Sequence, residues 1–171
     1  SYGIPDLNDR SYDTAKAQSQ AVATGTDAIS VAEVNYSVVT EAEQLSSLVL
    51  EIDKSSRLCI NIEVQGIHFL DMQVIGIGLS SGPGHASYIP VGHLCEDSSK
   101  QLELKVVLDK IAPLIENKGI SKCGYDMKYI SHILQTNATK LSSITTDVLL
   151  ASYVLNSVAT KHELNDIAKK Y

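Results

Sequence analysis

Two polar residues interrupt an apolar run that is typical of a buried β-strand. The stretch LCINIEVQGI, residues 58–67, is rich in apolar and β-branched residues and contains Asn61 and Glu63. Because side chains alternate along a strand, residues two apart point to the same face. Two carboxylates in this arrangement would supply half of a two-metal site that cleaves phosphodiesters. Here one of the two is an amide, which keeps an oxygen but carries no charge.

The composition is that of a globular domain with an acidic balance. The chain has 171 residues, of which 44% are hydrophobic and 20% are charged, and its formal net charge is −6. Domains that bind nucleic acid by themselves usually carry a basic face that neutralises phosphates. We therefore expect any affinity for DNA to come from another part of a larger protein.

The cysteines suggest a protein of a reducing cytosol, and the sequence predicts neither a membrane span nor a secretory signal. The three cysteines, Cys59, Cys95 and Cys123, are odd in number and show no CxxC spacing, so neither a disulfide framework nor a closed zinc site is expected. No apolar run reaches the roughly 18 residues of a membrane span. Residues 1–12 have neither the basic nor the apolar region of a secretory signal. The first residue is Ser, which is compatible with a piece of a longer polypeptide or with removal of the initiator Met.

The pattern of residues divides the chain into an arm and one domain. Residues 1–30 are rich in Ala, Ser, Thr and Gln, and we interpret them as a linker or N-terminal arm, with a short helix over 14–23 as an alternative. Residues 31–171 are expected to form the domain.

Within the domain, strands come first and helices follow. Strands are expected over 35–40, 57–64, 72–80 and 86–93, the last three as an antiparallel meander. The pair Thr40 and Glu43 predicts a capping-box start for a helix that runs to about residue 54. Later helices are expected over 101–117, 126–137, 143–157 and 161–171, with a short strand or turn over 121–124. Gly119 suits the C-cap of the first, and Thr145 or Thr146 the N-cap of the third. This order predicts an α/β (or α+β) fold, in which helices flank a mixed sheet built from the meander plus a parallel strand.

Four segments in this order resemble a known family. They are CINIEV, ASYIPVGH after a GPG turn, KCGYDMKYISHIL, and TDVLLASYVLNSVATKHELNDIAKKY. Over about residues 35–171 the chain resembles the 3′–5′ exonuclease (proofreading) domain of bacterial family A DNA polymerase I. The resemblance implies the ribonuclease H-like fold, which that domain shares with ribonuclease D.

The metal-binding motifs of the family are altered here. The family's Asp-x-Glu motif is matched by Asn61 and Glu63. Its Gly-x-Asn-x-Lys-Tyr-Asp motif is matched by residues 124–130, so that Asp126 stands at the Asn and Ile130 at the ligand Asp. A last motif, Tyr-x-x-x-Asp, lies beyond the matched segments. The resemblance thus implies a degenerate site with no intact catalytic set, in which Glu63 is the sole metal ligand, if there is any.

Of three other motif positions, Asp126 and Tyr129 have two interpretations each and Lys128 has one. Asp126 precedes Ile130 by one helical turn and could replace it as a ligand, but a displacement of about 6 Å along the axis favours a helix N-cap instead. Lys128 and Tyr129 match the motif and could face DNA, whereas a tyrosine on an apolar helix face more often belongs to the core.

The resemblance implies a function in DNA replication and repair. The parent protein is expected to be a DNA-directed DNA polymerase, a nucleotidyltransferase, of the bacterial cytoplasm. This domain would be an inactive exonuclease that binds no cofactor, remains monomeric, and supports the polymerase domain and the path of the DNA. An alternative is an active proofreading exonuclease with relocated ligands, which would need Mg²⁺ or Mn²⁺. A second alternative is a stand-alone ribonuclease H-like interaction module.

Overall fold

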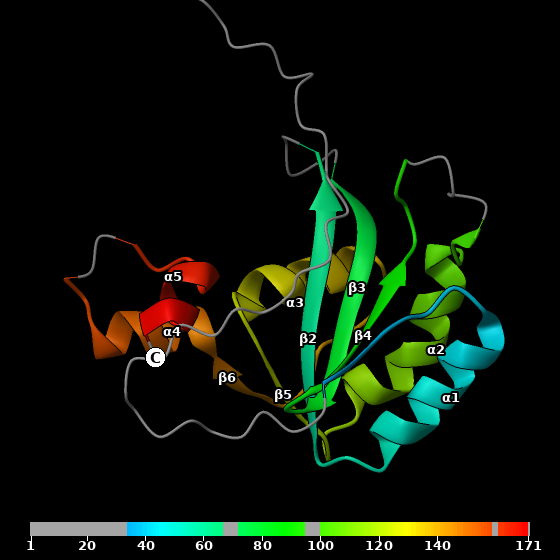
Figure 1. The fold of residues 1–171 in the computed structure, drawn as a ribbon, viewed down its shortest axis with the longest axis horizontal. Helices are drawn as coiled ribbons and strands as arrows, with labels where there is room; N and C mark the ends of the chain where they lie inside the picture. The colour runs from blue at the N-terminus through cyan, green and yellow to red at the C-terminus, as the bar shows by residue number, and fades with distance from the viewer. Residues whose placement is uncertain (1–33, 67–71, 95–99, 159–160, 171) are drawn as a thin grey trace, which may run out of the picture. The chain divides into compact units, whose positions relative to one another are not determined.

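The computed structural model describes residues 34–66, 72–94, 100–158 and 161–170, and these residues form a six-stranded sheet with helices packed against it (Figure 1). The strands are β1 (Asn35–Val38), β2 (Arg57–Gln65), β3 (Gln73–Gly82), β4 (His85–Pro90), β5 (Ser121–Gly124) and β6 (Ile144–Asp147). Their order across the sheet is β1-β4-β3-β2-β5-β6.

The sheet is mixed, as the sequence predicts. Strands β2, β3 and β4 form an antiparallel meander, and β5 runs parallel to β2. At the two edges β1 runs parallel to β4, and β6 runs parallel to β5. The predicted α/β fold with a mixed sheet is therefore confirmed. The strand predicted over 35–40 is present as β1.

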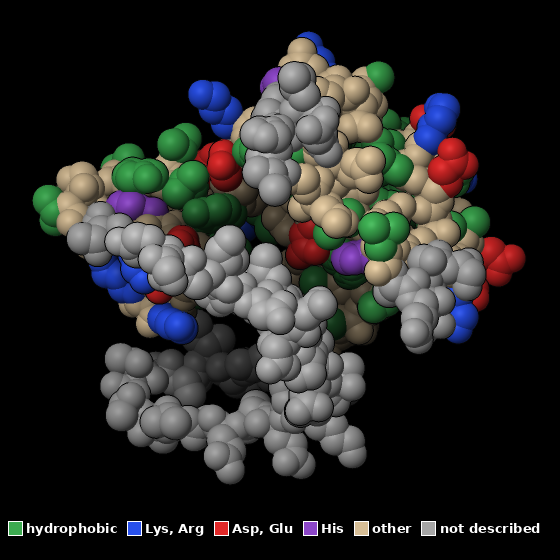
Figure 2. Space-filling model, turned by 90° about the horizontal axis from the view of Figure 1, so that it is seen from above, with side chains coloured by type: hydrophobic (Ala, Val, Ile, Leu, Met, Phe, Trp, Pro, Cys, Tyr) green, Lys and Arg blue, Asp and Glu red, His purple; other side chains and the backbone are tan. Residues whose placement is uncertain are grey.

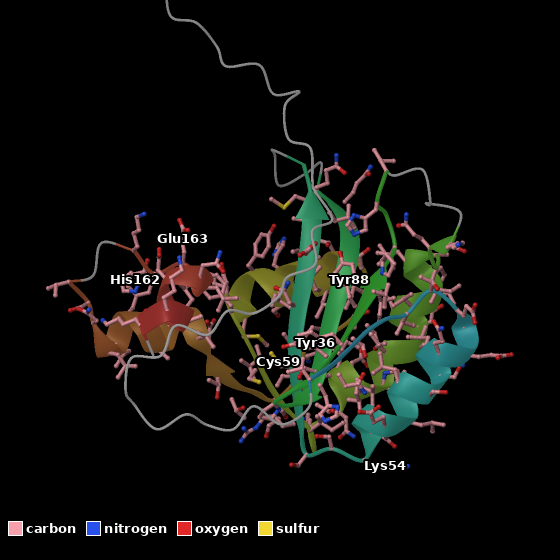
Figure 3. All side chains as sticks on the ribbon, in the orientation of Figure 1. Tyr36, Lys54, Cys59, Tyr88, His162 and Glu163 are labelled. Atoms are coloured by element: carbon pink, nitrogen blue, oxygen red, sulfur yellow. The ribbon has the colours of Figure 1, made fainter. Side chains whose placement is uncertain are left out.

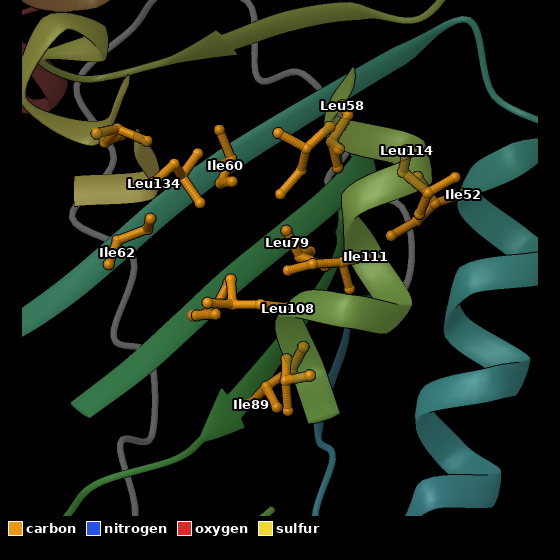
Figure 4. Close-up of a cluster of buried hydrophobic side chains, with 14 of the residues drawn as sticks. Ile52, Leu58, Ile60, Ile62, Leu79, Ile89, Leu108, Ile111, Leu114 and Leu134 are labelled. Carbon is orange, nitrogen blue, oxygen red and sulfur yellow. The ribbon is translucent and has the colours of Figure 1, made fainter. Parts of the chain in front are cut away.

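Five helices complete the described structure. They are α1 (Ala42–Asp53), α2 (Leu104–Glu116), α3 (Met127–Thr136), α4 (Val148–Leu155) and α5 (Leu164–Lys170). Buried side chains of α1, α2 and α3 share one hydrophobic core with the sheet (Figure 4). Within the described ranges no helix is both long and apolar enough to span a bilayer.

Strand β2 places the core on one side and its polar residues on the other. Leu58, Ile60 and Ile62 are buried, and the residues between them are exposed. Burying an aliphatic side chain of this size stabilises the fold by about 1.5–3 kcal/mol. A slip of one residue in register would bury Asn61 and Glu63 instead, so the hydrophobic pattern fixes which face they occupy.

The start predicted for the helix over 143–157 is wrong. Residues 144–147 form β6, which pairs in parallel with β5, and the helix begins only at Val148. Ile144, Thr145 and Thr146 are β-branched and suit a strand, while the N-cap is Asp147 rather than either threonine.

Two predicted caps are displaced by one or two residues. The N-cap of α1 is Glu41 instead of Thr40, and the Gln44 side chain accepts a hydrogen bond from its backbone N–H at 3.3 Å. The C-cap of α2 is Asn117, whose side-chain oxygen accepts a hydrogen bond at 2.8 Å from the backbone N–H of Gly119. The predicted arm over 1–30 lies outside the described residues.

Candidate functional site

Asn61 and Glu63 project from the face of β2 that lies opposite the core. Both are exposed, and their register partners on β3 are Gly78 and Gly76 respectively. Glycine partners leave the sheet surface low beside the two side chains. The register with β3 shifts directly after Glu63, where Ile75 is the extra residue on β3. Such a bulge changes the direction of neighbouring side chains, which is common next to active sites.

Glu63 already has a hydrogen-bond donor on β4. The Tyr88 hydroxyl donates to Glu63 Oε2 at 3.0 Å and lies 2.7 Å from His93 Nε2. A phenol has one proton, so when Tyr88 donates to Glu63 the His93 ring must carry its proton on Nε2 and donate to the Tyr88 oxygen. His93 is itself held by Gln101, whose side chain accepts from the His93 backbone N–H and donates to its carbonyl, both at 2.7 Å.

The environment keeps Tyr88 neutral. Burial is the largest effect that raises the pKa of Tyr88 well above its usual value, followed by the hydrogen bond to Glu63 and the charge of that carboxylate. Gly76 makes room for the ring, because a Cβ at this position would overlap the Tyr88 hydroxyl. The sequence analysis did not single out Tyr88. The segment ASYIPVGH, which contains both Tyr88 and His93, was the sequence signal that could have pointed to this residue.

The motif residues of α3 are directed to the helix and the core. Asp126 has the left-handed backbone conformation (φ 54°), and its Oδ1 accepts a hydrogen bond from the Tyr129 backbone N–H at 3.2 Å. The N-cap interpretation of Asp126 is therefore confirmed. Ile130 is 1% exposed and belongs to the core. Tyr129 packs partly buried against that core and donates to Met72 Sδ at 3.2 Å, whereas Lys128 is exposed.

A groove of about 790 Å³ runs along α3. Asp126, Lys128 and Tyr129 line it, together with His132 of the same helix and Leu150 of α4. Two of the motif residues that could face a ligand, Lys128 and Tyr129, thus share one groove.

Asp147 is a residue with a structural role that the sequence analysis missed. Its carboxylate caps α4 by accepting hydrogen bonds from the backbone N–H groups of Leu149 (2.9 Å) and Leu150 (3.4 Å). It also accepts from the backbone N–H groups of Asp126 (3.2 Å) and Met127 (2.8 Å), where α3 begins. One side chain therefore fixes the starts of two helices, including the one that carries the second motif. The available signal was an Asp directly before an apolar run, which is a typical helix start.

Few potential metal ligands lie close together in the part of the chain that the structure describes. No three His, Cys, Asp or Glu side chains of those residues are gathered as a metal ion would require. Ile130 offers no donor atom, and the Asp126 carboxylate is turned to the backbone of its own helix. Asn61 and Glu63 are left as the oxygen donors of the matched motif positions.

The sequence and structure are similar to those of known DNA polymerases and nucleases. DNA polymerase I of Pseudomonas aeruginosa is 30% identical over 142 residues, which cover 82% of this chain and 16% of that protein. The Synechocystis DNA polymerase I is 29% identical over 111 residues, covering 64% of this chain and 11% of that protein. The chain therefore spans less than a fifth of the curated relatives named here.

Solved structures show the same fold. The POL domain of Pol1 from M. smegmatis, in complex with DNA primer-template and dNTP, superposes with a TM-score of 0.60 at 20% identity, over 79% of this chain and 22% of that one. Escherichia coli RNase D, an exoribonuclease, superposes with a TM-score of 0.54 at 15% identity, over 70% of this chain and 29% of that one. These likenesses show that the chain shares the fold of these two proteins.

A family model connects the fold to the sequence. The model of the ribonuclease H-like domain of DNA polymerase I matches residues 60–171, which include β2 from Ile60 on, β3 to β6 and all of α2 to α5. The matched stretch covers more than half of the chain and contains the four segments singled out in the sequence, apart from the first residue of CINIEV. The chain belongs to the family of the ribonuclease H-like, 3′–5′ exonuclease domain of bacterial DNA polymerase I.

Proposed function

We propose that this domain has lost exonuclease activity and now supports the polymerase domain and the DNA path of a bacterial, cytoplasmic DNA polymerase I. The observation that carries the proposal is the state of the two altered motif positions. Asn61 presents a neutral amide where the family has a carboxylate, and Ile130 is buried in the core where the family has a second one.

The remaining donors do not fit a pair of divalent cations. Two-metal phosphoryl transfer needs several carboxylates around ions about 4 Å apart, because Mg²⁺ and Mn²⁺ are hard ions that prefer anionic oxygen. The matched positions hold two carboxylates, those of Glu63 and Asp126. Asp126 caps its own helix, and Glu63 already accepts a hydrogen bond from Tyr88. A single carboxylate does not compete well with the hydration shells of two such ions.

A digestion assay on the parent polymerase tests the loss of activity. A single-stranded primer is incubated with the enzyme and Mn²⁺ but no nucleotides, and its length is followed on a gel. We expect the wild type to shorten the primer no faster than a Glu63→Ala variant, while both extend a primed template normally in a separate reaction that contains nucleotides. The matched control is Glu51→Ala, which removes an exposed carboxylate from α1. Rapid shortening that Glu63→Ala abolishes and Glu51→Ala preserves would refute the proposal.

Calorimetry separates an inactive site from a site with relocated ligands. Titration of the chain with Mn²⁺ is expected to give no binding in the micromolar range. A two-site binding curve that disappears in Asp126→Ala would favour the active alternative, in which Asp126 turns from the helix cap to the metals. Circular dichroism of the same variant must show an intact helix content for this outcome to count.

The groove along α3 is the proposed contact with single-stranded DNA. Lys128 is exposed and lines it, so its ammonium can meet a phosphate. Tyr129 is partly buried, and we assign it a structural role. In the parent polymerase, Lys128→Ala is expected to weaken binding of single-stranded DNA and to reduce its salt dependence by about one counterion. Unchanged affinity at low salt would exclude the groove.

Helix α4 supplies a surface for contact with the rest of the parent polymerase. Hydrophobic side chains gather over α4 and α5 (Figure 2). Six described residues of this surface have side chains that are about half exposed or more: Leu150, Tyr153, Val154, Leu155, Val158 and Leu164. Apolar patches of this kind on a soluble domain mark interaction sites. We expect the amides of α4 to exchange hydrogen more slowly in the full-length polymerase than in this chain alone, and equal exchange in both would contradict the contact.

A further inference from the structure

Two cysteines that the sequence keeps far apart are direct neighbours in the sheet. Cys59 on β2 and Cys123 on β5 are register partners in the parallel pairing of these strands. Figure 3 labels Cys59 on β2, the strand that runs beside β5. The odd cysteine count argues against a disulfide framework in the sequence, but this register gives one specific pair.

Both thiols lie on the face of the sheet that is turned away from the core. The neighbours of Cys59 in the strand, Leu58 and Ile60, are buried, whereas Cys59 is exposed. Lys122 and Gly124 are likewise buried on either side of the partly exposed Cys123. Register partners in parallel strands point to the same face, so the two sulfur atoms share one side of the sheet.

The spacing of the strands suits a covalent bond. Neighbouring strands lie about 4.7–4.9 Å apart, and disulfides join residues whose Cα atoms are about 4.4–6.8 Å apart. Burial is the largest effect that raises the pKa of Cys59, which reaches about 11, and the charge and the hydrogen bonding of Cys123 raise it further. The two thiols therefore interact with each other. At neutral pH the Cys59 thiol therefore stays protonated and reacts slowly.

Cys59 is accessible from a groove. A groove of about 450 Å³ is lined by Cys59 and Asn61 of β2, by Tyr36 and Val38 of β1, and by Tyr88 of β4. Cys59 thus lies beside the motif positions, two residues before Asn61, where a small-molecule disulfide can approach it.

We propose that Cys59 and Cys123 form a reversible disulfide site that links β2 to β5 when the cell becomes oxidising. The oxidant is a small-molecule disulfide such as oxidised glutathione. The thiolate of one cysteine attacks a sulfur of glutathione disulfide, a mixed disulfide forms, and one glutathione leaves as a thiolate. The second cysteine then attacks the protein sulfur of the mixed disulfide and releases the second glutathione. Two protein thiols are oxidised, one glutathione disulfide is reduced to two glutathione molecules, and the two thiol protons pass to the leaving thiolates.

Peptide mapping tests the proposal on the chain with Cys95→Ser. The chain is incubated with oxidised glutathione, remaining thiols are alkylated, and the protein is cut with trypsin. Cleavage after Arg57, Lys100, Lys122 and Lys128 places the two cysteines in peptides 58–100 and 123–128. We expect these two peptides to be joined by a disulfide that a reductant cleaves, and the ratio of this product to mixed disulfides to be at least about tenfold higher in native buffer than in denaturing urea.

Single variants provide the matched controls. With Cys59→Ser or Cys123→Ser added, one thiol remains, so the product is expected to be a mixed disulfide with glutathione. Mapping of the wild-type chain with a protease that cuts after Phe69, between Cys59 and Cys95, repeats the test without the Cys95→Ser substitution. Unmodified thiols, stable mixed disulfides at both cysteines, or cross-links between two chains would each overturn the proposal. So would equal yields of the internal disulfide in native buffer and in urea.

Discussion

Replacing Asp147 with alanine should destabilise the starts of two helices at once. Its carboxylate accepts hydrogen bonds from four backbone N–H groups, those of Leu149 and Leu150 in α4 and those of Asp126 and Met127 at the start of α3. Alanine accepts none of them, and the first N–H groups of a helix have no partner within the helix.

The magnitude follows from these contacts. Replacement of an N-cap Asp by Ala costs about 0.5–2 kcal/mol per helix. The bond to Leu150 is long at 3.4 Å and the residue is exposed, so water can replace much of it. The bonds to Met127, Asp126 and Leu149 are better formed. We expect Asp147→Ala to lower the free energy of unfolding by about 2–3 kcal/mol, a large part of the roughly 5–15 kcal/mol of a typical domain.

Equilibrium unfolding in urea, followed by circular dichroism, measures this change. With a slope of about 2 kcal/mol per molar urea, the midpoint should fall by about 1–1.5 M while the slope stays the same. Asp147→Asn keeps one acceptor oxygen and should lose only about half as much.

The control is Asp109→Ala. Asp109 pairs with Lys105 at 3.0 Å, with both side chains more than two thirds exposed (68% and 76%). Such surface pairs contribute less than about 1 kcal/mol, so this variant should unfold close to the wild type. If Asp147→Ala and Asp109→Ala had equal effects, or if the former cost less than about 0.5 kcal/mol, the shared-cap explanation would be refuted.

Three further predictions concern the sheet. Burial lowers the pKa of the ammonium group of Lys122, so the folded chain loses this proton at lower pH than the unfolded chain. The free energy of unfolding of the wild type, relative to that of Lys122→Met, should therefore rise as the pH approaches the usual lysine pKa of 10.5. A difference between the two proteins in urea melts that stays constant with pH would contradict this. Gly124→Ala places a Cβ 2.6 Å from a backbone carbonyl oxygen of β2, whereas a Cβ at Gly82 has open space, so thermal melts should show a loss of about 1–3 kcal/mol for the first alone. Tyr88→Phe removes the hydrogen bond to Glu63 and should cost about 1 kcal/mol at neutral pH. Because the pKa of Tyr88 is raised in the folded chain, this difference should shrink as the pH rises above the usual value of 10.0, and a difference that grows there would be inconsistent with a neutral Tyr88 donor.

The sequence by itself determined which side of β2 is polar and where α3 begins. The alternation of Ile60 and Ile62 with Asn61 and Glu63 needs no distant residue, because the side chains of a strand alternate whatever surrounds it. The start of α3 is equally local, since Asp126 caps a backbone N–H three residues ahead. The order of the strands and the family segments likewise led to the correct fold and family.

Only the tertiary structure decided the contacts between distant segments. The strand at 144–147 forms because β5 offers it an edge, and the periodicity of the helical residues that follow concealed this in the sequence. Tyr88 reaches Glu63 across a glycine of the strand between them, and Cys59 meets Cys123 through the register of two parallel strands. These partners are dozens of residues apart in the chain, and a side chain's local pattern specifies its face but not its neighbour, which depends on how the strands pair and pack.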